Sequence, residues 1–287
     1  MFANVSARMG RIRFGPSGLR TDVEPEAAVA EVAGAGFDAC EVGFVGGFKL
    51  DYPLVERLGE AARAHDVALS VHAPLAGFMG HLDLGKKYRM AVGMLDHTAG
   101  LAAACGAEVV VFHPGFLLGR EREQALDDVV EQLGLLGERL EAKGRLVPFG
   151  VEVMGRVRDL GSLEDVVELA ARVPFVRPVL DFAHLHATSD GAYTDMEPFA
   201  AALEAVDGVL DPGAPFHVHF SDIAYANRNE TKHLPYGEGT LRAEPLAAAL
   251  ARFERPATVI SEAPDEASTQ AIGAALRAGA SSASRSS

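Results

Sequence analysis

Residues 177–187 read Arg-Pro-Val-Leu-Asp-Phe-Ala-His-Leu-His-Ala. The apolar pair Val179 and Leu180 indicates a strand that is buried on both faces. Asp181 ends this strand, and His184 follows three residues later. Carboxylate and imidazole groups at the exit of a buried strand need polar partners. For this stretch alone, a simpler interpretation is that Asp181 caps the next turn and His184 packs in the core.

The same pattern recurs along the chain, which favours a functional interpretation. Five other apolar runs end in a histidine or an acid: Val-His72, Val-Phe-His113, Val-Glu152, Val-His219 and Ile-Ser-Glu262. Strand ends that carry histidine, glutamate and aspartate and that converge in space are what a metal site requires.

Length and composition favour a single large domain. The chain has 287 residues, 48% of them hydrophobic, which suits one α/β barrel with a large core. No apolar run approaches a membrane span, and residues 1–10 lack the features of a signal peptide. Cys40 and Cys105 form no C-x-x-C pair, which argues against sulfur ligands. We therefore expect a cytoplasmic protein without a membrane partner, for which Met9 is an alternative start.

The formal net charge of -14 would ordinarily count against a nucleic-acid partner. Two or three bound divalent ions, however, bring about four to six positive charges into a cleft, and the local charge matters more than the total. The acidic composition therefore does not exclude DNA.

β-type and helical segments alternate through the whole sequence. The predicted strands are 12–15, 39–44, 68–73, 108–113, 149–154, 178–183, 216–221 and 258–262, and amphipathic segments such as 126–140 lie between them. Eight such units predict an α/β fold, a single (β/α)8 TIM barrel. No nucleotide-binding glycine motif supports an open sheet. We assign 1–10 to an N-terminal extension, 11–278 to the barrel and 279–287 to a disordered tail.

In such barrels the chemistry lies at the C-terminal ends of the strands, and the candidate ligands fall there. They come from the third to the eighth strand in succession: His72, His113, Glu152, Asp181, His219 and Glu262. Six ligands exceed the needs of one tetrahedral ion. We therefore predict a cluster of at least two metal ions, with Glu152 as the bridge.

Further polar residues lie near these strand ends. His184 and His233 are candidates for another ion; alternatively, His184 supports a ligand and His233 contacts substrate. His217 lies one layer deeper in the barrel than His219, so we expect a buried, hydrogen-bonded role for it. Asp222 is predicted to orient His219 as an outer partner.

Together these segments resemble the endonuclease IV family, the zinc-dependent apurinic/apyrimidinic endonucleases within the xylose-isomerase-like barrels. The resemblance covers about 12–276 and rests on Ser-Val-His72-Ala-Pro, Val-Phe-His113-Pro-Gly, Val-Glu152-Val-Met, Leu-Asp181-Phe-Ala-His184, His219-Phe-Ser-Asp222, His233 before Gly-Glu-Gly, and Ile-Ser-Glu262. It implies a first zinc on His72, His113 and Glu152, a second on Glu152, Asp181, His219 and Glu262, and a third on His184 and His233.

Two positions depart from the family pattern. Thr231 stands where the family usually has an aspartate, two residues before the loop histidine, and Leu75 stands where it usually has a DNA-facing tyrosine. Glu230 carries the charge that Thr231 lacks. Because a loop can rotate to present either neighbour, we predict that Glu230 completes a third site with His184 and His233.

The leading functional hypothesis is a metal-dependent phosphodiester hydrolase that cuts damaged double-stranded DNA 5′ to an abasic site, leaving a 3′-hydroxyl. Its cofactor is expected to be two or three Zn²⁺ ions, with Mn²⁺ as the alternative metal, and its catalytic residues Glu152 and Glu262. The alternative is a one-metal sugar isomerase or epimerase of the same superfamily, which would share the core of Glu152, Asp181, His219 and Glu262 and act on a small sugar. A non-catalytic metal-dependent binding protein is a third hypothesis.

Overall fold

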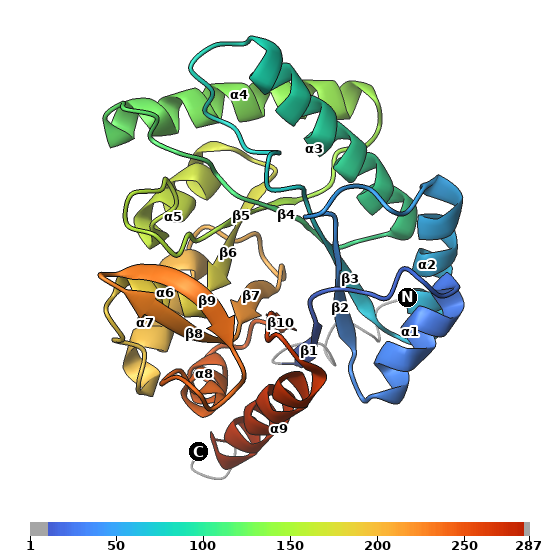
Figure 1. The fold of residues 1–287 in the computed structure, drawn as a ribbon, viewed down its shortest axis with the longest axis vertical. Helices are drawn as coiled ribbons and strands as arrows, with labels where there is room; N and C mark the ends of the chain where they lie inside the picture. The colour runs from blue at the N-terminus through green and yellow to red at the C-terminus, as the bar shows by residue number, and fades with distance from the viewer. Residues whose placement is uncertain (1–10, 284–287) are drawn as a thin grey trace.

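The structure, a computed structural model, describes residues 11–283. Within them, eight parallel strands form a nearly closed barrel in the order β1-β10-β7-β6-β5-β4-β3-β2 (Figure 1). These are β1 (Ile12–Pro16), β2 (Ala39–Gly43), β3 (Ala68–His72), β4 (Val110–Phe112), β5 (Phe149–Glu152), β6 (Val176–Asp181), β7 (Phe216–Phe220) and β10 (Ala257–Ser261). An isolated parallel bridge between Ser17 and Glu41 joins β1 to β2. The predicted single (β/α)8 barrel is confirmed.

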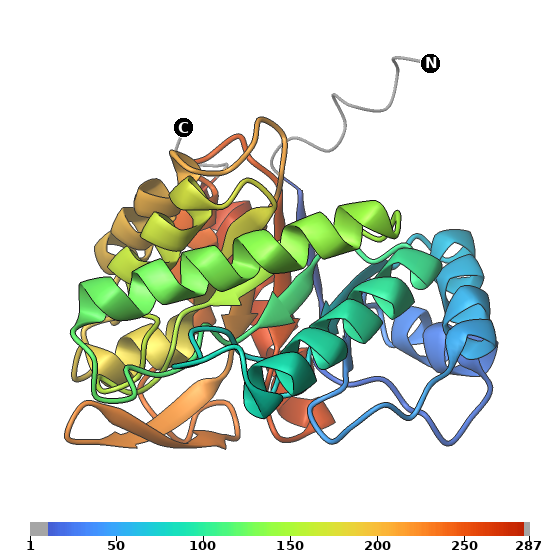
Figure 2. The same cartoon turned by 90° about the horizontal axis from the view of Figure 1, so that it is seen from above.

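Helices surround the barrel (Figures 1 and 2). They are α1 (Pro25–Gly34), α2 (Tyr52–Ala64), α3 (Lys86–Cys105), α4 (Arg122–Ala142), α5 (Leu163–Arg172), α6 (Phe182–Thr188), α7 (Met196–Asp207), α8 (Ala243–Leu250) and α9 (Glu266–Ala283). Local sequence explains their starts: Pro25 opens α1, and Ser162 forms a capping box with Asp165 at α5. No helix in residues 11–283 is long and apolar enough to cross a membrane.

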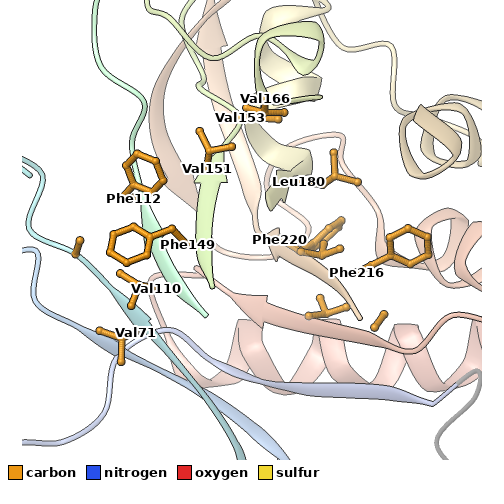
Figure 3. Close-up of a cluster of buried hydrophobic side chains, with 14 of the residues drawn as sticks. Val71, Val110, Phe112, Phe149, Val151, Val153, Val166, Leu180, Phe216 and Phe220 are labelled. Carbon is orange, nitrogen blue, oxygen red and sulfur yellow. The ribbon is translucent and has the colours of Figure 1, made fainter. Parts of the chain in front are cut away.

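Side chains alternate between two environments along each strand. One set, which includes Phe112, Phe149 and Phe220, packs against the helices in the main core (Figure 3). The other set points into the barrel, where small apolar clusters such as Val109, Val111 and Val179 fill the interior. The candidate ligands belong to this inward set, at the C-terminal ends of the strands. The barrel therefore directs them toward one another.

An antiparallel hairpin follows β7, where the sequence analysis predicted a loop. It consists of β8 (Asp222–Ala226) and β9 (Asn229–Leu234), and it lies at the same end of the barrel as the loops after β2 and β3 (Figure 2). Asn227 and Arg228 turn the chain with φ values of 52° and 61°. This pair of positive φ angles matches the twist of a tight hairpin. The polar composition of β9 concealed the strand.

The C-terminal end also differs from the prediction. Helix α9 continues through Ala283, so residues 279–283 are not the disordered segment expected from their composition. Gly279 lies against α8, where an added Cβ would come within 2.6 Å of the Ala247 side chain. The lack of a side chain at Gly279 allows this close approach of α9 to α8. The predictions for 1–10, including Met9, and for 284–287 lie outside the described residues.

Candidate metal centre

The nine predicted metal ligands gather at the C-terminal end of the barrel. Within residues 11–283 they form three groups: His72, His113 and Glu152; Glu152, Asp181, His219 and Glu262; and His184, Glu230 and His233. In each group, one ligand atom per residue lies within 4.8 Å of all the others. The first two groups are those that the resemblance implied, and the third joins its His184 and His233 to Glu230, which was predicted separately. The donors are imidazole nitrogens and carboxylate oxygens, which suit zinc.

Glu152 occupies the junction between the first two groups. Its Oε2 lies 3.1 Å from Nε2 of His113 and 3.2 Å from Nε2 of His72, while Oε1 lies 3.1 Å from Nδ1 of His219. Ligand atoms around a tetrahedral zinc ion are roughly 3.3–3.6 Å apart. The spacing therefore fits metal ligation, and the two oxygens face different groups, as a bridging carboxylate requires.

Asp181 and Glu262 complete the second group. Oδ1 of Asp181 accepts a hydrogen bond from the His184 backbone N–H at 2.8 Å and caps α6, so the capping interpretation also holds. Its buried Oδ2 accepts no hydrogen bond from the described residues. Glu262 lies between two groups, with Oε1 3.5 Å from His219 Nδ1 and Oε2 3.9 Å from His233 Nε2. A buried carboxylate oxygen without a hydrogen-bond donor, lying among other ligand atoms, fits the binding of a cation.

The third group depends on a β-bulge. In the hairpin, Ala224 pairs with Lys232 but Tyr225 pairs with Glu230, so Thr231 is the extra residue. In a regular strand, residues three apart point to opposite faces. The bulge brings Glu230 onto the face of His233. The predicted side chain is thus presented by a bulged strand, and the predicted loop rotation is wrong.

Three of the histidines present Nε2 to the metal-ligand groups and bind an uncharged partner with Nδ1. His72 Nδ1 lies 2.9 Å from the Ala73 carbonyl, and His184 Nδ1 lies 2.7 Å from the Val153 carbonyl. A carbonyl only accepts, so these Nδ1 atoms carry the proton. His233 Nδ1 lies 2.5 Å from the Ser221 hydroxyl. This arrangement leaves the Nε2 lone pairs free for a metal.

Burial and mutual charge shift the titration of these groups. Burial raises the pKa of Asp181 to about 6 and also raises the pKa of Glu262. Burial opposes ionisation of Glu152, but the neighbouring His219 and His113 hold its pKa well below the usual range. The pKa of His72 rises to about 9, because Glu152 and Glu41 outweigh the effect of burial. These shifts follow from carboxylates and imidazoles that are packed together and shielded from solvent.

The predicted outer partner of His219 is wrong. Asp222 is fully buried, but it turns toward the loop after the hairpin. Its carboxylate accepts hydrogen bonds from the Arg242 guanidinium and from the backbone N–H groups of Ile223, Gly237, Gly239 and Leu241. Asp222 therefore orders this loop.

The partner of His219 is Glu41, which the sequence analysis missed. Glu41 is fully buried on β2, and its Oε2 lies 3.2 Å from His219 Nε2 and 3.6 Å from His217 Nε2. That His217 nitrogen makes no hydrogen bond within the described structure, against our expectation. The sequence did contain a signal for this role. Glu41 lies between Cys40 and Val42, which pack in the main core, so the alternation along the strand points Glu41 into the barrel.

Comparison with known proteins agrees with this fold. The family model of the xylose isomerase-like TIM barrel matches residues 29–281. The chain belongs to that family. An uncharacterized protein of Methanocaldococcus jannaschii is 29% identical over 258 residues, which cover 88% of this chain and 91% of that protein. A probable endonuclease 4 of Bacillus velezensis is 27% identical over 192 residues, or 62% of each chain.

Solved structures of two named activities share the fold. A D-tagatose 3-epimerase-like protein matches with a TM-score of 0.74 at 20% identity, covering 96% of this chain and 99% of that one. Endonuclease IV from Thermus thermophilus matches with a TM-score of 0.70 at 20% identity, covering 94% and 99%. At this identity, the likeness shows the fold and leaves the reaction open.

Proposed function

We propose that the protein is a zinc-dependent endonuclease that hydrolyses the phosphodiester bond 5′ to an abasic site in double-stranded DNA. The observation that carries this proposal is the pair of histidine-rich groups beside the four-residue core. The core of Glu152, Asp181, His219 and Glu262 suffices for one ion. The other groups, which contain His72 with His113 and His184 with His233, provide for further ions that a one-metal sugar enzyme does not need.

Bound zinc would polarise the phosphate and lower the pKa of water. The protein side chains supply the remaining roles. Glu152, with a side chain only 1% exposed, is placed to hold two ions. Glu262 is more accessible, with 20% of its side chain exposed, and burial raises its pKa. It is the carboxylate best placed to accept a proton near a substrate.

The face around the metal centre suits an anionic polymer despite the net charge. Exposed basic side chains lie on the loops, on the hairpin and at the start of α3 at this end of the barrel: Lys49, Lys86, Lys87, Arg156, Arg158, Arg228 and Lys232. Such groups contact phosphates and give binding that weakens with salt. They support a nucleic-acid partner at this face.

Exposed apolar side chains accompany these cations. Leu75, three residues after His72, is 50% exposed, and Leu82, Phe116 and Val157 are exposed on neighbouring loops. Apolar side chains presented to a duplex can enter between base steps. Leu75 therefore offers a contact of a different chemistry from the tyrosine usual at this position.

A second candidate, a sugar epimerase, is favoured by one observation. Glu152, Asp181, His219 and Glu262 form one complete ligand group that a single ion can occupy. The four-residue core alone would serve such a reaction.

The test uses zinc-loaded protein and a 5′-labelled duplex with one tetrahydrofuran abasic analogue, beside an undamaged duplex. We expect one nick on the 5′ side of the analogue, with a 3′ end that a DNA polymerase extends. The same preparation is incubated with ketohexoses, and the products are separated by chromatography. Intact DNA together with epimerised sugar would reject the endonuclease in favour of the second candidate.

A further inference from the structure

A charged layer lies beneath the metal-ligand groups, inside the barrel. It contains Glu41 on β2, Ser70 on β3 and His217 on β7, all buried. Oε1 of Glu41 and Nε2 of His217 have no hydrogen-bond partner among the described residues. A carboxylate buried this deeply is costly unless it has a task or a partner. The charged residue nearest to the Glu41 carboxylate on the side of the metal-ligand groups is His219, at 3.2 Å.

The two ring nitrogens of His219 face different carboxylates. Nδ1 lies 3.1 Å from Glu152 Oε1 and 3.5 Å from Glu262 Oε1, within the second group. Nε2 lies 3.2 Å from Glu41 Oε2 on the far side of the ring. A neutral imidazole carries one proton, so a ring that offers Nδ1 to a metal must carry its proton on Nε2.

We propose that Glu41 is a positioning residue for the metal centre, which accepts the Nε2–H of His219 and thereby keeps Nδ1 free and directed at the second ion. This inference rests on the metal centre of the proposed function and is independent of the DNA substrate. A carboxylate that accepts from a ligand imidazole fixes the tautomer and raises the basicity of the ligating nitrogen.

His219 differs from the other histidines in the charge of its outer partner. His72 and His184 donate Nδ1–H to backbone carbonyls, and His233 contacts a hydroxyl. Hydrogen bonds to a carboxylate are roughly twice as strong as those between neutral groups. His219 is also completely buried. Full burial and a charged partner therefore both hold the orientation of the His219 ring.

Neighbouring strands fix Glu41 itself. Glu41 and Ser70 are register partners on β2 and β3, and the Ser70 hydroxyl donates to Glu41 Oε2 at 2.8 Å. The Glu41 carbonyl accepts from the Gly18 backbone N–H at 2.8 Å. Held at both its backbone and its side chain, Glu41 reaches across the barrel to β7. The hydrogen bonds from Ser70 and Gly18 therefore hold Glu41 in place for its contact with His219.

A direct ligand role for Glu41 is the competing interpretation. One ligand atom each of Glu41, His217 and His219 lies within 4.8 Å of the others. An ion there would need the Nε2 lone pair of His219 while Nδ1 serves the second group. The imidazole would then have lost both protons. Donation of Nε2–H to Glu41 avoids this cost, so we favour the positioning role.

The test compares Glu41→Gln with Asp222→Asn, a buried carboxylate of the same region that does not contact His219. Zinc affinity is measured on metal-free protein by competition with a chromophoric chelator, and cobalt-loaded protein gives the visible absorption of the site. We expect one stepwise zinc affinity of Glu41→Gln, that of the second ion, to fall about 10–100-fold and the cobalt bands to shift. Asp222→Asn should stay within about threefold.

Two results would overturn the proposal. One is that the zinc affinity and the cobalt bands of Glu41→Gln equal those of the parent. The other is that the parent binds an additional ion at Glu41, His217 and His219 and that Glu41→Gln loses this ion, which would make Glu41 a ligand. Circular dichroism and thermal unfolding of the metal-free variants report folding separately. If Glu41→Gln does not fold, Ser70→Ala replaces it, and unchanged zinc affinity in that variant would reject the role. These readouts need no DNA, so they are independent of the nicking assay.

Discussion

Oε2 of Glu230 lies 2.8 Å from Nε2 of His184, and this contact joins the hairpin to the start of α6. The bulge at Thr231 makes this contact possible, because the bulge places the Glu230 side chain on the same face of the hairpin as His233. A glutamate beside the usual aspartate position, with its longer side chain, thus reaches the third group.

Replacement of Glu230 tests that group. Glu230→Ala should lose one equivalent of zinc and at least about tenfold in cleavage rate, because an ion left with two imidazoles loses its charged ligand. Thr231→Ala is the matched control, since the Thr231 hydroxyl bonds the Ala224 carbonyl at 2.9 Å and faces away from the group. Elemental analysis and duplex cleavage measure both. If Glu230→Ala keeps its zinc and its rate, the third site does not exist.

Gly155 offers a second, steric test. A Cβ at this position would lie 2.7 Å from both the Glu230 carboxylate and the His184 ring. Gly155→Ala should therefore separate the two side chains and weaken the third zinc about tenfold or more, while the barrel stays folded. Gly46→Ala is the control, because no described atom lies within 4 Å of its added Cβ. Equal zinc affinity of the two variants would contradict the assigned contact.

Glu152→Gln should abolish turnover and leave the barrel intact. An amide keeps the size of the side chain but loses the charge with which one carboxylate can hold two ions. Cleavage of the abasic duplex, zinc content and circular dichroism are measured together. Activity within tenfold of the parent, with unchanged zinc, would remove Glu152 from its proposed role.

Away from the centre, Asp96 links α3 to the end of α4. The buried carboxylate contacts Arg139 at 2.7 Å, Arg145 at 3.3 Å and Lys143. Burial opposes its charge, but Lys143 and Arg139 lower its pKa below the usual value. Because the cations are partly exposed, we expect Asp96→Asn to lose only about 1–2 kcal/mol at pH 7.

The pH dependence of this effect follows from the lowered pKa. Asp96 contributes its stability above the unfolded pKa of about 3.9, and the contribution disappears as the pH falls through the lower folded value. The difference in melting temperature between parent and Asp96→Asn, a few degrees at pH 7, should close toward pH 3. Glu168→Gln, which breaks an exposed pair with Arg172, should change little. A constant difference across this range would contradict the assignment.

Much of the fold was predictable because the barrel repeats one local pattern. Apolar runs such as 149–154 mark the buried strands, and residues of one parity, including Glu152 and His219, must point into the closed barrel. Periodicity and closure together bring the strand ends into one place. The convergence of the ligands required no further information.

The remaining features depend on contacts that no local pattern specifies. The hairpin arises from a turn at Asn227 and a bulge at Thr231, both hidden in a polar stretch. Asp222 and Glu41 are both buried acids near the ligands, and only the tertiary structure distinguishes the one that meets His219. Which acid contacts His219 depends on distances across the barrel, and the sequence pattern does not specify these distances.

The number of metal ions per chain tests the central claim most directly. The account predicts about three zinc equivalents, and at least two, in protein purified without chelators, and loss of cleavage after chelation that added zinc restores. Elemental analysis by mass spectrometry, normalised to protein concentration, gives the value. A single ion per chain that resists further loading would contradict the cluster and favour the one-metal epimerase.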